Sequence, residues 1–371
     1  MKIICIVGAR PNFIKMAPII NAFDHDKEIV PYLVHTGQHY DKELSELFFH
    51  DLKLAQPNIN LGVGSGSDTQ QTSKIMRSFE PVLLDINPDA VLVVGDVNST
   101  LACALVTAKS GIKLIHVEAG LRSHDRSMPE EINRIITDSI SDILFCTEHD
   151  AMNNLRAEGI SKDKIFLVGN VMIDTLLQNS EKAHETSILE DLNLEPKQFS
   201  LLTLHRQSNV TDIHTLNRIL KAIQVIQRDT TIVMPIHPRT KKIFMEGNLE
   251  LTLDELPHLK IIPPQGYLNF LELMTNARVV LTDSGGIQEE TTILQIPCLT
   301  LRDNTERPIT VTNGTNIIVG TKTSDIIKQF QKTDKSFHAP VNPPDLWDGK
   351  AADRITKILK RTIVCKKINN T

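Results

Sequence analysis

Short apolar runs alternate with amphipathic helical patterns along the whole chain, and this alternation is the strongest constraint on its fold. The predicted strands are apolar and bounded by polar loops, at 3–7, 30–34, 90–94, 113–117, 143–146, 165–168, 200–204, 231–235, 260–262, 279–282 and 298–301. Helical patterns such as 72–84, 100–109 and 171–177 lie between them. Such alternation requires parallel sheets covered by helices. We therefore predict an α/β protein built from doubly wound, Rossmann-like domains.

The chain is long enough for two of these domains. Its 371 residues exceed the size at which a single core stops growing. The stretch 181–194 is charged and lacks strand character, and 332–350 is Pro-rich and loop-like. We therefore place an N-terminal domain at 1–169 and a C-terminal, nucleotide-binding domain at 170–350. Two such domains facing each other would present the carboxyl ends of both sets of strands to one cleft.

Composition excludes several classes of protein. A net charge of -5 argues against non-specific nucleic-acid binding. The five cysteines are scattered, without metal-ligand spacing, which predicts a reducing cytosol and no metal site. The apolar run 3–9 is short and precedes Arg10-Pro11, so we expect a first strand rather than a signal peptide. No apolar run reaches the ~18 residues of a transmembrane helix, so no membrane association is expected.

A small-residue turn follows the predicted strand 279–282. Asp283-Ser284-Gly285-Gly286 leads into a helical pattern that carries Glu290. The glycines allow a ligand to approach the backbone, and the helix N-terminus attracts anions. A tight turn without a ligand is the simpler interpretation of two glycines alone. The later Arg307 adds a fixed positive charge and favours a nucleotide diphosphate, with Glu290 reaching the ribose hydroxyls.

Charged residues also follow the strands of the first half. Arg10 and Lys15 follow the first strand, and a cation early in a helix suggests a neighbouring anion, although a solvated surface pair explains Lys15 alone. Asp96 follows the strand 90–94; it could cap the next helix, but Asn98 or Ser99 could cap it equally well. Glu118 follows the strand 113–117, where ligands bind in such folds, or it forms a structural salt bridge with Arg122 or Arg126.

The segment 127–134 matches a capping box. Ser127 would cap the helix and Glu130 would reach back to it, which is the simpler interpretation of Glu130. In the second half, His205-Arg206 and His237-Pro-Arg239 each follow a strand and suit a leaving diphosphate. No Gly-x-Gly-x-x-Gly follows the first strand, so a tightly bound NAD is not indicated. Several carboxylates with a diphosphate site suggest proton chemistry on a nucleotide sugar.

Taken together, these motifs resemble the non-hydrolysing UDP-N-acetylglucosamine 2-epimerases. The resemblance covers roughly residues 1–320 and rests on motifs in the family's order: Gly8-Ala-Arg-Pro11, Gly95-Asp96, His116-Val-Glu-Ala-Gly-Leu-Arg122, Pro129-Glu-Glu131 with Asn133-Arg134, His205-Arg206, Asp283-Ser-Gly-Gly-Ile-Gln-Glu-Glu290 and Thr305-Glu-Arg-Pro308. It implies a glycosyltransferase-B type fold of two facing domains, with the helix at 351–371 packing back on the first. It also implies a cytoplasmic homodimer that needs no cofactor.

The resemblance also assigns a reaction and its residues. UDP is eliminated across C1–C2 to give 2-acetamidoglucal, and its re-addition gives UDP-N-acetylmannosamine. The catalytic residues carried over are Asp96, Glu118, Glu130 and His205. The UDP contacts carried over are Arg10, Lys15, His237, Phe270, Ser284, Gly285, Gly286, Glu290 and Arg307, with Phe270 beside the uracil.

The chain departs from the family at one site. Gln38 and Arg206 match the second substrate site of many bacterial members, whereas Asp41 and Gln70 differ from it, so activation by substrate is not expected. The segments 35–40 and 61–67 are also similar to relatives that act on UDP-2,3-diacetamido-glucuronate. Two further alternatives stay open: a glycosyltransferase of the same fold and a non-catalytic UDP-sugar sensor.

Overall fold

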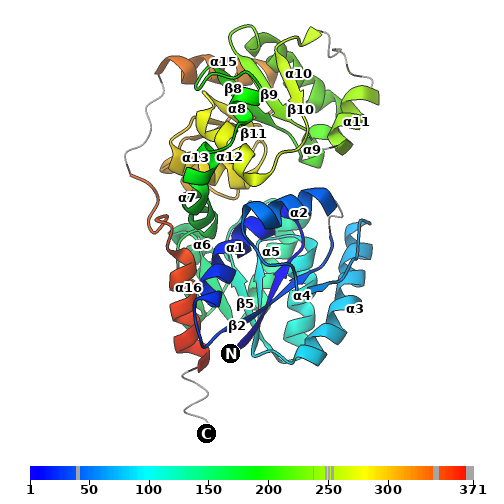
Figure 1. The fold of residues 1–371 in the computed structure, drawn as a ribbon, viewed down its shortest axis with the longest axis vertical. Helices are drawn as coiled ribbons and strands as arrows, with labels where there is room; N and C mark the ends of the chain where they lie inside the picture. Colours follow the sequence, from blue (N-terminus) through cyan, green and yellow to red (C-terminus); the bar gives the residue numbers. More distant parts are fainter. Residues whose placement is uncertain are drawn as a thin grey trace. The chain divides into compact units, whose positions relative to one another are not determined.

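The computed structural model describes residues 1–38, 42–236, 238–246, 249, 251, 255–336 and 342–364. The chain divides into two compact units, the first formed by Met1–Gln178 with Asp345–Thr371 and the second by Asn179–Pro344. Each unit holds a parallel sheet surrounded by helices (Figure 1). The predicted α/β class with two parallel sheets is therefore confirmed.

The sheet of unit 1 has seven strands in the order β3-β2-β1-β4-β5-β6-β7. They are β1 Lys2–Val7, β2 Val30–His35, β3 Ile59–Asn60, β4 Ala90–Val94, β5 Lys113–Val117, β6 Ile143–Cys146 and β7 Ile165–Leu167. Every residue of β4 is buried, because helices cover both faces of a parallel sheet. The predicted strands agree with these bounds to within about a residue. Only β3 was not predicted, since its two residues carry no periodic signal.

Helices connect these strands. They are α1 Arg10–Asp24, α2 Lys42–Asp51, α3 Asp68–Ile86, α4 Asn98–Lys109, α5 Pro129–Ile140, α6 His149–Ala157, η1 Lys162–Lys164 and α7 Val171–His184. The start of α3 shows how sequence sets a boundary: the Ser67 side chain accepts from the Gln70 N–H, and Gln70 reaches back to the Ser67 N–H. Apolar side chains of α3 and α4, such as Phe79 and Val106, pack into one core with β1 and β4.

Unit 2 repeats the same topology with six strands in the order β10-β9-β8-β11-β12-β13. They are β8 Phe199–Thr203, β9 Thr231–Pro235, β10 Leu259–Ile262, β11 Val280–Thr282, β12 Cys298–Thr300 and β13 Asn316–Ile318. Its helices are α8 Ile188–Asp191, α9 Gln207–Val210, α10 Ile213–Ile226, α11 Pro238–Glu246, α12 Tyr267–Asn276, α13 Gly285–Leu294, α14 Ile309–Thr312 and α15 Thr323–Ser336. The short edge strand β13 was not predicted.

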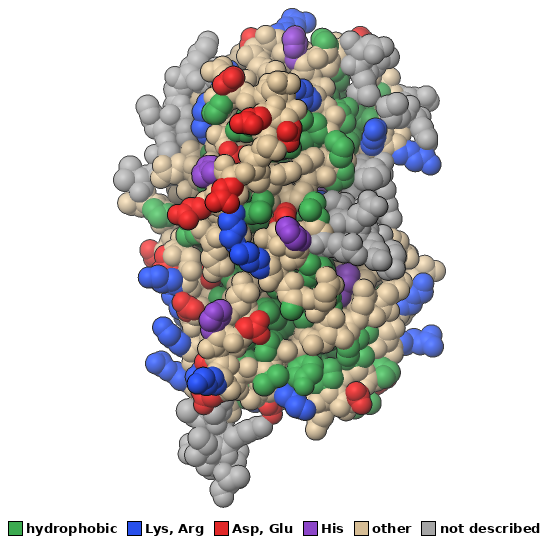
Figure 2. All heavy atoms as spheres, viewed as in Figure 1, with side chains coloured by type: hydrophobic (Ala, Val, Ile, Leu, Met, Phe, Trp, Pro, Cys, Tyr) green, Lys and Arg blue, Asp and Glu red, His purple; other side chains and the backbone are tan. Residues whose placement is uncertain are grey.

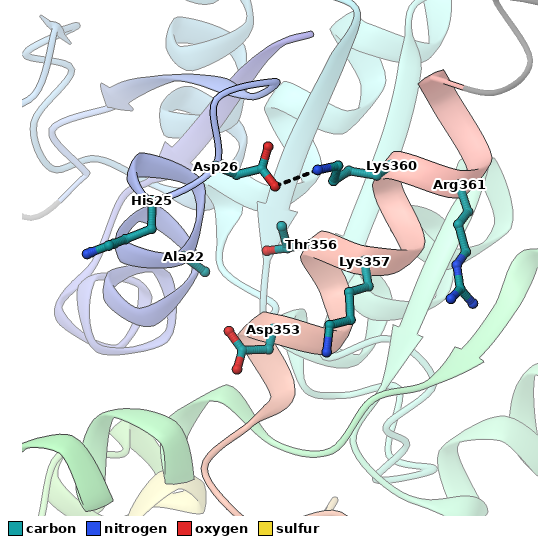
Figure 3. A pocket seen from close by; sticks show the side chains of 8 residues that line it. All are labelled: Ala22, His25, Asp26, Asp353, Thr356, Lys357, Lys360 and Arg361. Carbon is teal, nitrogen blue, oxygen red and sulfur yellow. Dashed lines mark hydrogen bonds and ion pairs between the residues drawn. The ribbon is translucent and has the colours of Figure 1, made fainter.

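The chain returns to unit 1 through α16 Ala351–Leu359 and η3 Lys360–Val364, and α16 packs against α1. Lys360 Nζ lies 2.9 Å from Asp26 Oδ2 (Figure 3). A surface hollow of about 480 Å³ beside this pair contains none of the predicted site residues. The Asp174 carboxylate of α7 accepts the N–H groups of Ala351 and Ala352 at 3.1 and 2.7 Å. These contacts join α16 to α7 within unit 1, which comprises the residues up to 178 and those from 345 onward.

Strand order reverses at the same place in both sheets, between β1 and β4 and between β8 and β11. Open α/β sheets bind ligands beyond the carboxyl ends of the strands at this switch point. On the face seen in Figure 2, acidic and basic side chains are interspersed, as the small net charge suggests. Among the described residues, no helix combines the length and apolar character needed to cross a bilayer.

Candidate active site

Glu118 lies immediately after β5 and pairs with Lys15 of α1 in unit 1. The two side chains are in contact, and they are only 4 % and 7 % exposed. The alternative of a solvated surface pair for Lys15 is therefore wrong, and the structural alternative for Glu118, a salt bridge to Arg122 or Arg126, gives way to the pair with Lys15. Arg122 instead contacts Asp138 at 2.7 Å and Glu158 at 2.6 Å.

The backbone around Glu118 is unusual. Glu118 has φ +71°, a left-handed conformation that costs a non-glycine residue about 1–3 kcal/mol. Gly95, after β4, has φ +70°, and a Cβ there would lie 3.2 Å from Lys15 Nζ and 3.3 Å from Glu118 Oε2. A glycine at 95 therefore allows the backbone before Asp96 to approach the ion pair closely. Strained backbone of this kind is concentrated at functional sites.

Asp96 is anchored by α5 rather than used as a helix cap. Its carboxylate pairs with Arg134, and its carbonyl accepts from Asn133 Nδ2 at 2.8 Å. The predicted alternative caps are wrong as well, because Val97 occupies the N-cap position of α4 without a side-chain hydrogen bond. Asn98 instead donates to Asp68 at 3.0 Å. The Asp96 side chain stays 26 % exposed, which leaves it accessible to a ligand.

The predicted capping box at the start of α5 does not form. The helix begins at Pro129, Met128 is its N-cap, and Ser127 Oγ donates to Asp125 Oδ1 at 2.6 Å. The structural interpretation of Glu130 is therefore wrong, and its half-buried carboxylate lies in the first turn of α5. A carboxylate there is favoured by the helix dipole.

The neighbouring Glu131 is the anchor that sequence reasoning missed. It is buried and accepts the N–H groups of Ser123 and His124 at 3.0 and 2.9 Å and a bond from Arg134 at 2.7 Å. Burial favours its neutral form, but the N–H of Ser123 and the Arg134 guanidinium outweigh burial and hold the pKa of Glu131 below its ordinary value. Glu131 therefore fixes the loop after Arg122 and orients the guanidinium that binds Asp96.

In unit 2, His205 follows β8 and Asp283 follows the adjacent β11. His205 Nδ1 lies 2.8 Å from Asp283 Oδ1, and Asp283 also accepts the N–H of Arg206 at 3.0 Å. Burial raises the pKa of Asp283, but His205 and the backbone donors outweigh burial and lower it overall. The carboxylate accepts from Nδ1, so Nε2 of the half-exposed ring is left to act on a ligand. Sequence reasoning placed Asp283 in the turn but missed its role in orienting His205.

Arg307 lies against the N-terminus of α13. A Cβ on Gly285 would lie 2.6 Å from both Arg307 Nη1 and Glu306 Oε1, so a side chain there would force the guanidinium to shift. Arg307 also lies 2.7 Å from Glu289 Oε1. Ser284 is the N-cap of α13 and makes no side-chain capping bond. The combination of a helix N-terminus and a held guanidinium is suited to a diphosphate.

Glu290 lies one turn into α13 and is fully buried. Burial, together with the nearby Glu289, raises the pKa of Glu290 to about 8. Tyr267 of α12 donates to Glu290 Oε1 at 2.9 Å and fixes the orientation of the carboxyl group. Phe270 lies on α12, as Tyr267 does, and is half-buried.

The remaining predicted residues are placed as follows. Arg10 is the exposed first residue of α1, and its guanidinium lies 5.7 Å from the centre of the Phe48 ring. Gly286 is the second residue of α13. His237, and Asp41 of the second substrate site, lie outside the described residues. Within unit 1 the structure pairs Lys15 with Glu118 and places Gly95, the residue before Asp96, against this pair; within unit 2 it brings together His205 with Asp283 and Gly285 with Arg307.

Comparison with known proteins identifies the family. The family model described as UDP-N-acetylglucosamine 2-epimerase matches residues 21–360. A UDP-N-acetylglucosamine 2-epimerase of Methanocaldococcus jannaschii is 46% identical over 97% of this chain and 99% of the relative. A UDP-2,3-diacetamido-2,3-dideoxy-D-glucuronate 2-epimerase of Pseudomonas aeruginosa is 39% identical over 97% of this chain and 100% of the relative.

Solved structures agree with the family. The crystal structure of the M. jannaschii enzyme in complex with UDP-GlcNAc and UDP matches with a TM-score of 0.91, covering 97% of this chain and 100% of that chain. The Neisseria meningitidis enzyme bound to UDP-GlcNAc matches at 32% identity with a TM-score of 0.88, covering 98% of this chain and 100% of that chain. The resemblance drawn from the motifs is confirmed, as is the glycosyltransferase-B-like fold class of two parallel-sheet domains. The chain belongs to the UDP-N-acetylglucosamine 2-epimerase family, whose members are isomerases of UDP-sugars.

Proposed function

We propose that this protein interconverts UDP-N-acetylglucosamine and UDP-N-acetylmannosamine. The observation that carries the proposal is the pair of held carboxylates after β4 and β5 of unit 1. Asp96, after β4, is held by Arg134, and the strained Glu118, after the adjacent β5, is held by Lys15. Two anchored carboxylates after adjacent parallel strands are suited to moving a proton on a bound sugar.

The proposed chemistry is an elimination followed by an addition. A carboxylate takes the proton from C2 of the sugar, the C2–H electron pair forms the C1–C2 double bond, and the C1–O bond breaks with its pair leaving on the UDP. Re-addition of UDP at C1 and of a proton at the other face of C2 gives the epimer. The net change is an isomerisation, so the proposal includes no redox cofactor.

We assign the residues as follows. Asp96, Glu118 and Glu130 handle the proton and the positive charge that develops on the ring, and His205 stabilises the leaving diphosphate. Arg307 and the N-terminus of α13, formed by Ser284, Gly285 and Gly286, hold the diphosphate. Glu290 contacts the ribose and Phe270 the uracil, while Arg10, Lys15 and His237 complete the contacts to the nucleotide. The buried Arg307 beside the α13 N-terminus supports the diphosphate assignment.

The test is proton NMR of UDP-N-acetylglucosamine with the enzyme in heavy water. Formation of UDP-N-acetylmannosamine with deuterium at C2 in both epimers is expected. Transfer of the sugar to an added acceptor without C2 exchange would indicate a glycosyltransferase. Binding without exchange or turnover would indicate a sensor.

A second substrate has support from one comparison. The P. aeruginosa relative is named for UDP-2,3-diacetamido-2,3-dideoxy-D-glucuronate. Measurement of kcat/KM for both UDP-sugars decides between them, and we expect the higher value for UDP-N-acetylglucosamine because the M. jannaschii relative is the more similar in sequence.

We also infer a cytoplasmic homodimer. The family resemblance implies the dimer, and sedimentation velocity should show twice the mass of 41.5 kDa. Cys5, Cys103, Cys146 and Cys298 are buried free thiols, which suits a reducing compartment.

A further inference from the structure

A buried cluster lies beneath the carboxylates of unit 1. It is formed by His116 of β5, Asp138 of α5 and Arg122, whose side chains are at most 1 % exposed. His116 Nδ1 lies 2.6 Å from Asp138 Oδ1, and His116 Nε2 lies 2.9 Å from the carbonyl oxygen of Gly95. Asp138 Oδ2 accepts the Gly120 N–H at 3.0 Å and pairs with Arg122 at 2.7 Å.

Hydrogen-bond roles in this cluster follow from the partners. A backbone carbonyl can only accept, so His116 Nε2 must donate to Gly95. Asp138 accepts from Gly120 and from the always-charged Arg122, so it acts as an ionised acceptor toward His116 Nδ1 as well. Burial favours the neutral acid, but His116 and Arg122 outweigh it and hold the pKa of Asp138 below its ordinary value. Both ring nitrogens of His116 therefore have a hydrogen-bond partner, one on Asp138 and one on the Gly95 backbone.

One carboxylate thus controls two segments of backbone. Through His116 it holds the carbonyl of Gly95, in the peptide unit that leads into Asp96. Through the Gly120 N–H it holds the turn that follows Glu118, whose φ of +71° persists only if its surroundings impose it. Gly120 itself has φ +84°, and a Cβ there would lie 2.3 Å from the carbonyl oxygen of Ala151, so this turn cannot shift freely.

We propose that Asp138 is a positioning residue of this enzyme, which sets the Asp96 and Glu118 segments in register with each other. The proposal rests on the proposed function for its effect on turnover. Asp138 is fully buried and cannot touch a substrate, so it acts through His116 and Gly120. Reactions that depend on two groups held together are sensitive to small displacements of either one.

The test uses Asp138→Asn, with Asp142→Asn as a matched control. Asp142 Oδ2 accepts the Leu114 N–H at 2.9 Å at the opposite end of β5, so the control alters a similar carboxylate–backbone bond away from the site. Asparagine at 138 keeps the size of the side chain but cannot accept from His116, Gly120 and Arg122 together. Thermal melting establishes that each variant is folded.

Two readouts are measured on the full-length protein. Turnover of UDP-N-acetylglucosamine should fall on the order of 10- to 100-fold in kcat for Asp138→Asn, with a much smaller change in KM, because orientation and not binding is lost. Amide hydrogen exchange without substrate should become faster in both 95–98 and 118–121. The Asp142→Asn variant should change neither readout in this way.

The outcomes separate the two proposals. Wild-type-like kcat and exchange in folded Asp138→Asn would overturn the positioning role, as would an equal loss of kcat in Asp142→Asn. A wild-type protein without epimerase activity would refute the proposed function, and the exchange readout alone would then decide the positioning role. If Asp138→Asn does not fold, His116→Gln replaces it. In this variant, amide exchange should become faster at 95–98, while the Gly120 amide, held directly by Asp138, stays protected. An equal increase in exchange rate at 95–98 and at Gly120 would contradict the proposal.

Discussion

At the scale of single residues, the partner of each carboxyl group sets how buried and how strongly held that group is. Glu118 is buried against Lys15, whereas Asp96 is partly exposed and held by Arg134. In unit 2, Glu290 is a buried carboxyl beside the Tyr267 hydroxyl. These carboxyl groups lie in different surroundings, and different surroundings allow groups of one type to take different roles.

Loss of the carboxylates should abolish most turnover. Asp96→Asn and Glu118→Gln should each lower kcat by on the order of 10²-fold or more, as for loss of an acid–base group. Glu118→Gln also removes the carboxylate that Lys15 contacts, which should destabilise the fold by about 3–5 kcal/mol. The double variant Lys15→Met/Glu118→Gln should recover melting temperature without recovering turnover.

Melting curves and steady-state kinetics test this prediction, with the exposed Glu80→Gln as the control. Near-normal turnover in both Asp96→Asn and Glu118→Gln would refute the proton-transfer assignment.

Glu290 should make stability depend on pH. Its pKa is raised from 4.5 to about 8 in the folded protein, so between these two values the folded state holds a proton that the unfolded state has lost. The contribution of Glu290 to stability therefore falls as pH rises from the lower value to the higher one, with a slope of about 1.4 kcal/mol per pH unit. The Glu290→Gln variant has no carboxyl group that titrates at this position. Its stability relative to that of the wild type should therefore increase as pH rises.

Thermal melts of the wild type and of Glu290→Gln from about pH 5 to about pH 9 measure how their difference in melting temperature changes with pH, as expected for a buried carboxyl group with a raised pKa. A constant difference in melting temperature across this range would mean that Glu290 titrates normally.

At the scale of elements, the turn between β11 and α13 combines backbone and side-chain recognition of an anion. The helix starts at Gly285, and Arg307 Nη1 lies 2.6 Å from the position that a Cβ at 285 would take. Arg206 and Arg302 both pair with Glu306, which in turn contacts Arg307 at 2.7 Å. This chain of ion pairs fixes the guanidinium relative to the helix N-terminus.

Changes at this turn should weaken UDP binding. Arg307→Ala should cost roughly 1.5–3 kcal/mol, the range for a hydrogen bond to a charged group. Gly285→Val should cost more, because its side chain displaces Arg307 and obstructs the helix N-terminus. Gly66→Ala is the control, since a Cβ at Gly66 meets no atom closer than 3.5 Å. Calorimetric titration with UDP measures all three, and unchanged affinity in the first two would place the nucleotide elsewhere.

At the scale of the whole molecule, one topology is used twice. Each unit has the same strand order around its first strand, and each places charged residues after the strands that flank the reversal. The carboxylates lie in unit 1 and the helix N-terminus with Arg307 in unit 2, so the sugar should be recognised by unit 1 and the diphosphate mainly by unit 2, with Arg10 and Lys15 of unit 1 adding contacts to the nucleotide.

Hydrogen exchange with two ligands should separate these roles. UDP alone should protect the start of α13 and residues 305–310, because ligand binding lowers the population of open states. UDP-N-acetylglucosamine should extend protection to 95–98 and 118–122. Protection of the first turn of α1 by UDP alone would support the assignment of Arg10 and Lys15 to the nucleotide. Protection restricted to unit 2 with the complete substrate would contradict the proposed division.

Local patterns in the sequence determined the helices and strands, and the edge of each sheet at which the candidate site residues lie. Apolar runs followed by helical periodicity specify strands and helices through interactions between near neighbours, and parallel pairing then brings the loops after β1, β4 and β5 to one edge. Asp96, Glu118 and His205 could therefore be placed after strands without a structure. The two edge strands β3 and β13 were not predicted because each is short and contains an asparagine, so neither forms a clear apolar run.

Only the tertiary structure decided which charges meet. Lys15 and Glu118 are separated by 103 positions, and His205 and Asp283 by 78, so no local pattern could pair them. The capping box predicted for Ser127 and Glu130 failed for a different, local reason: the Ser127 hydroxyl donates to Asp125, and the adjacent Glu131 accepts bonds from Ser123 and Arg134. A buried charge must find a partner once the chain is compact, and the choice among partners depends on the packing of helices against the sheet.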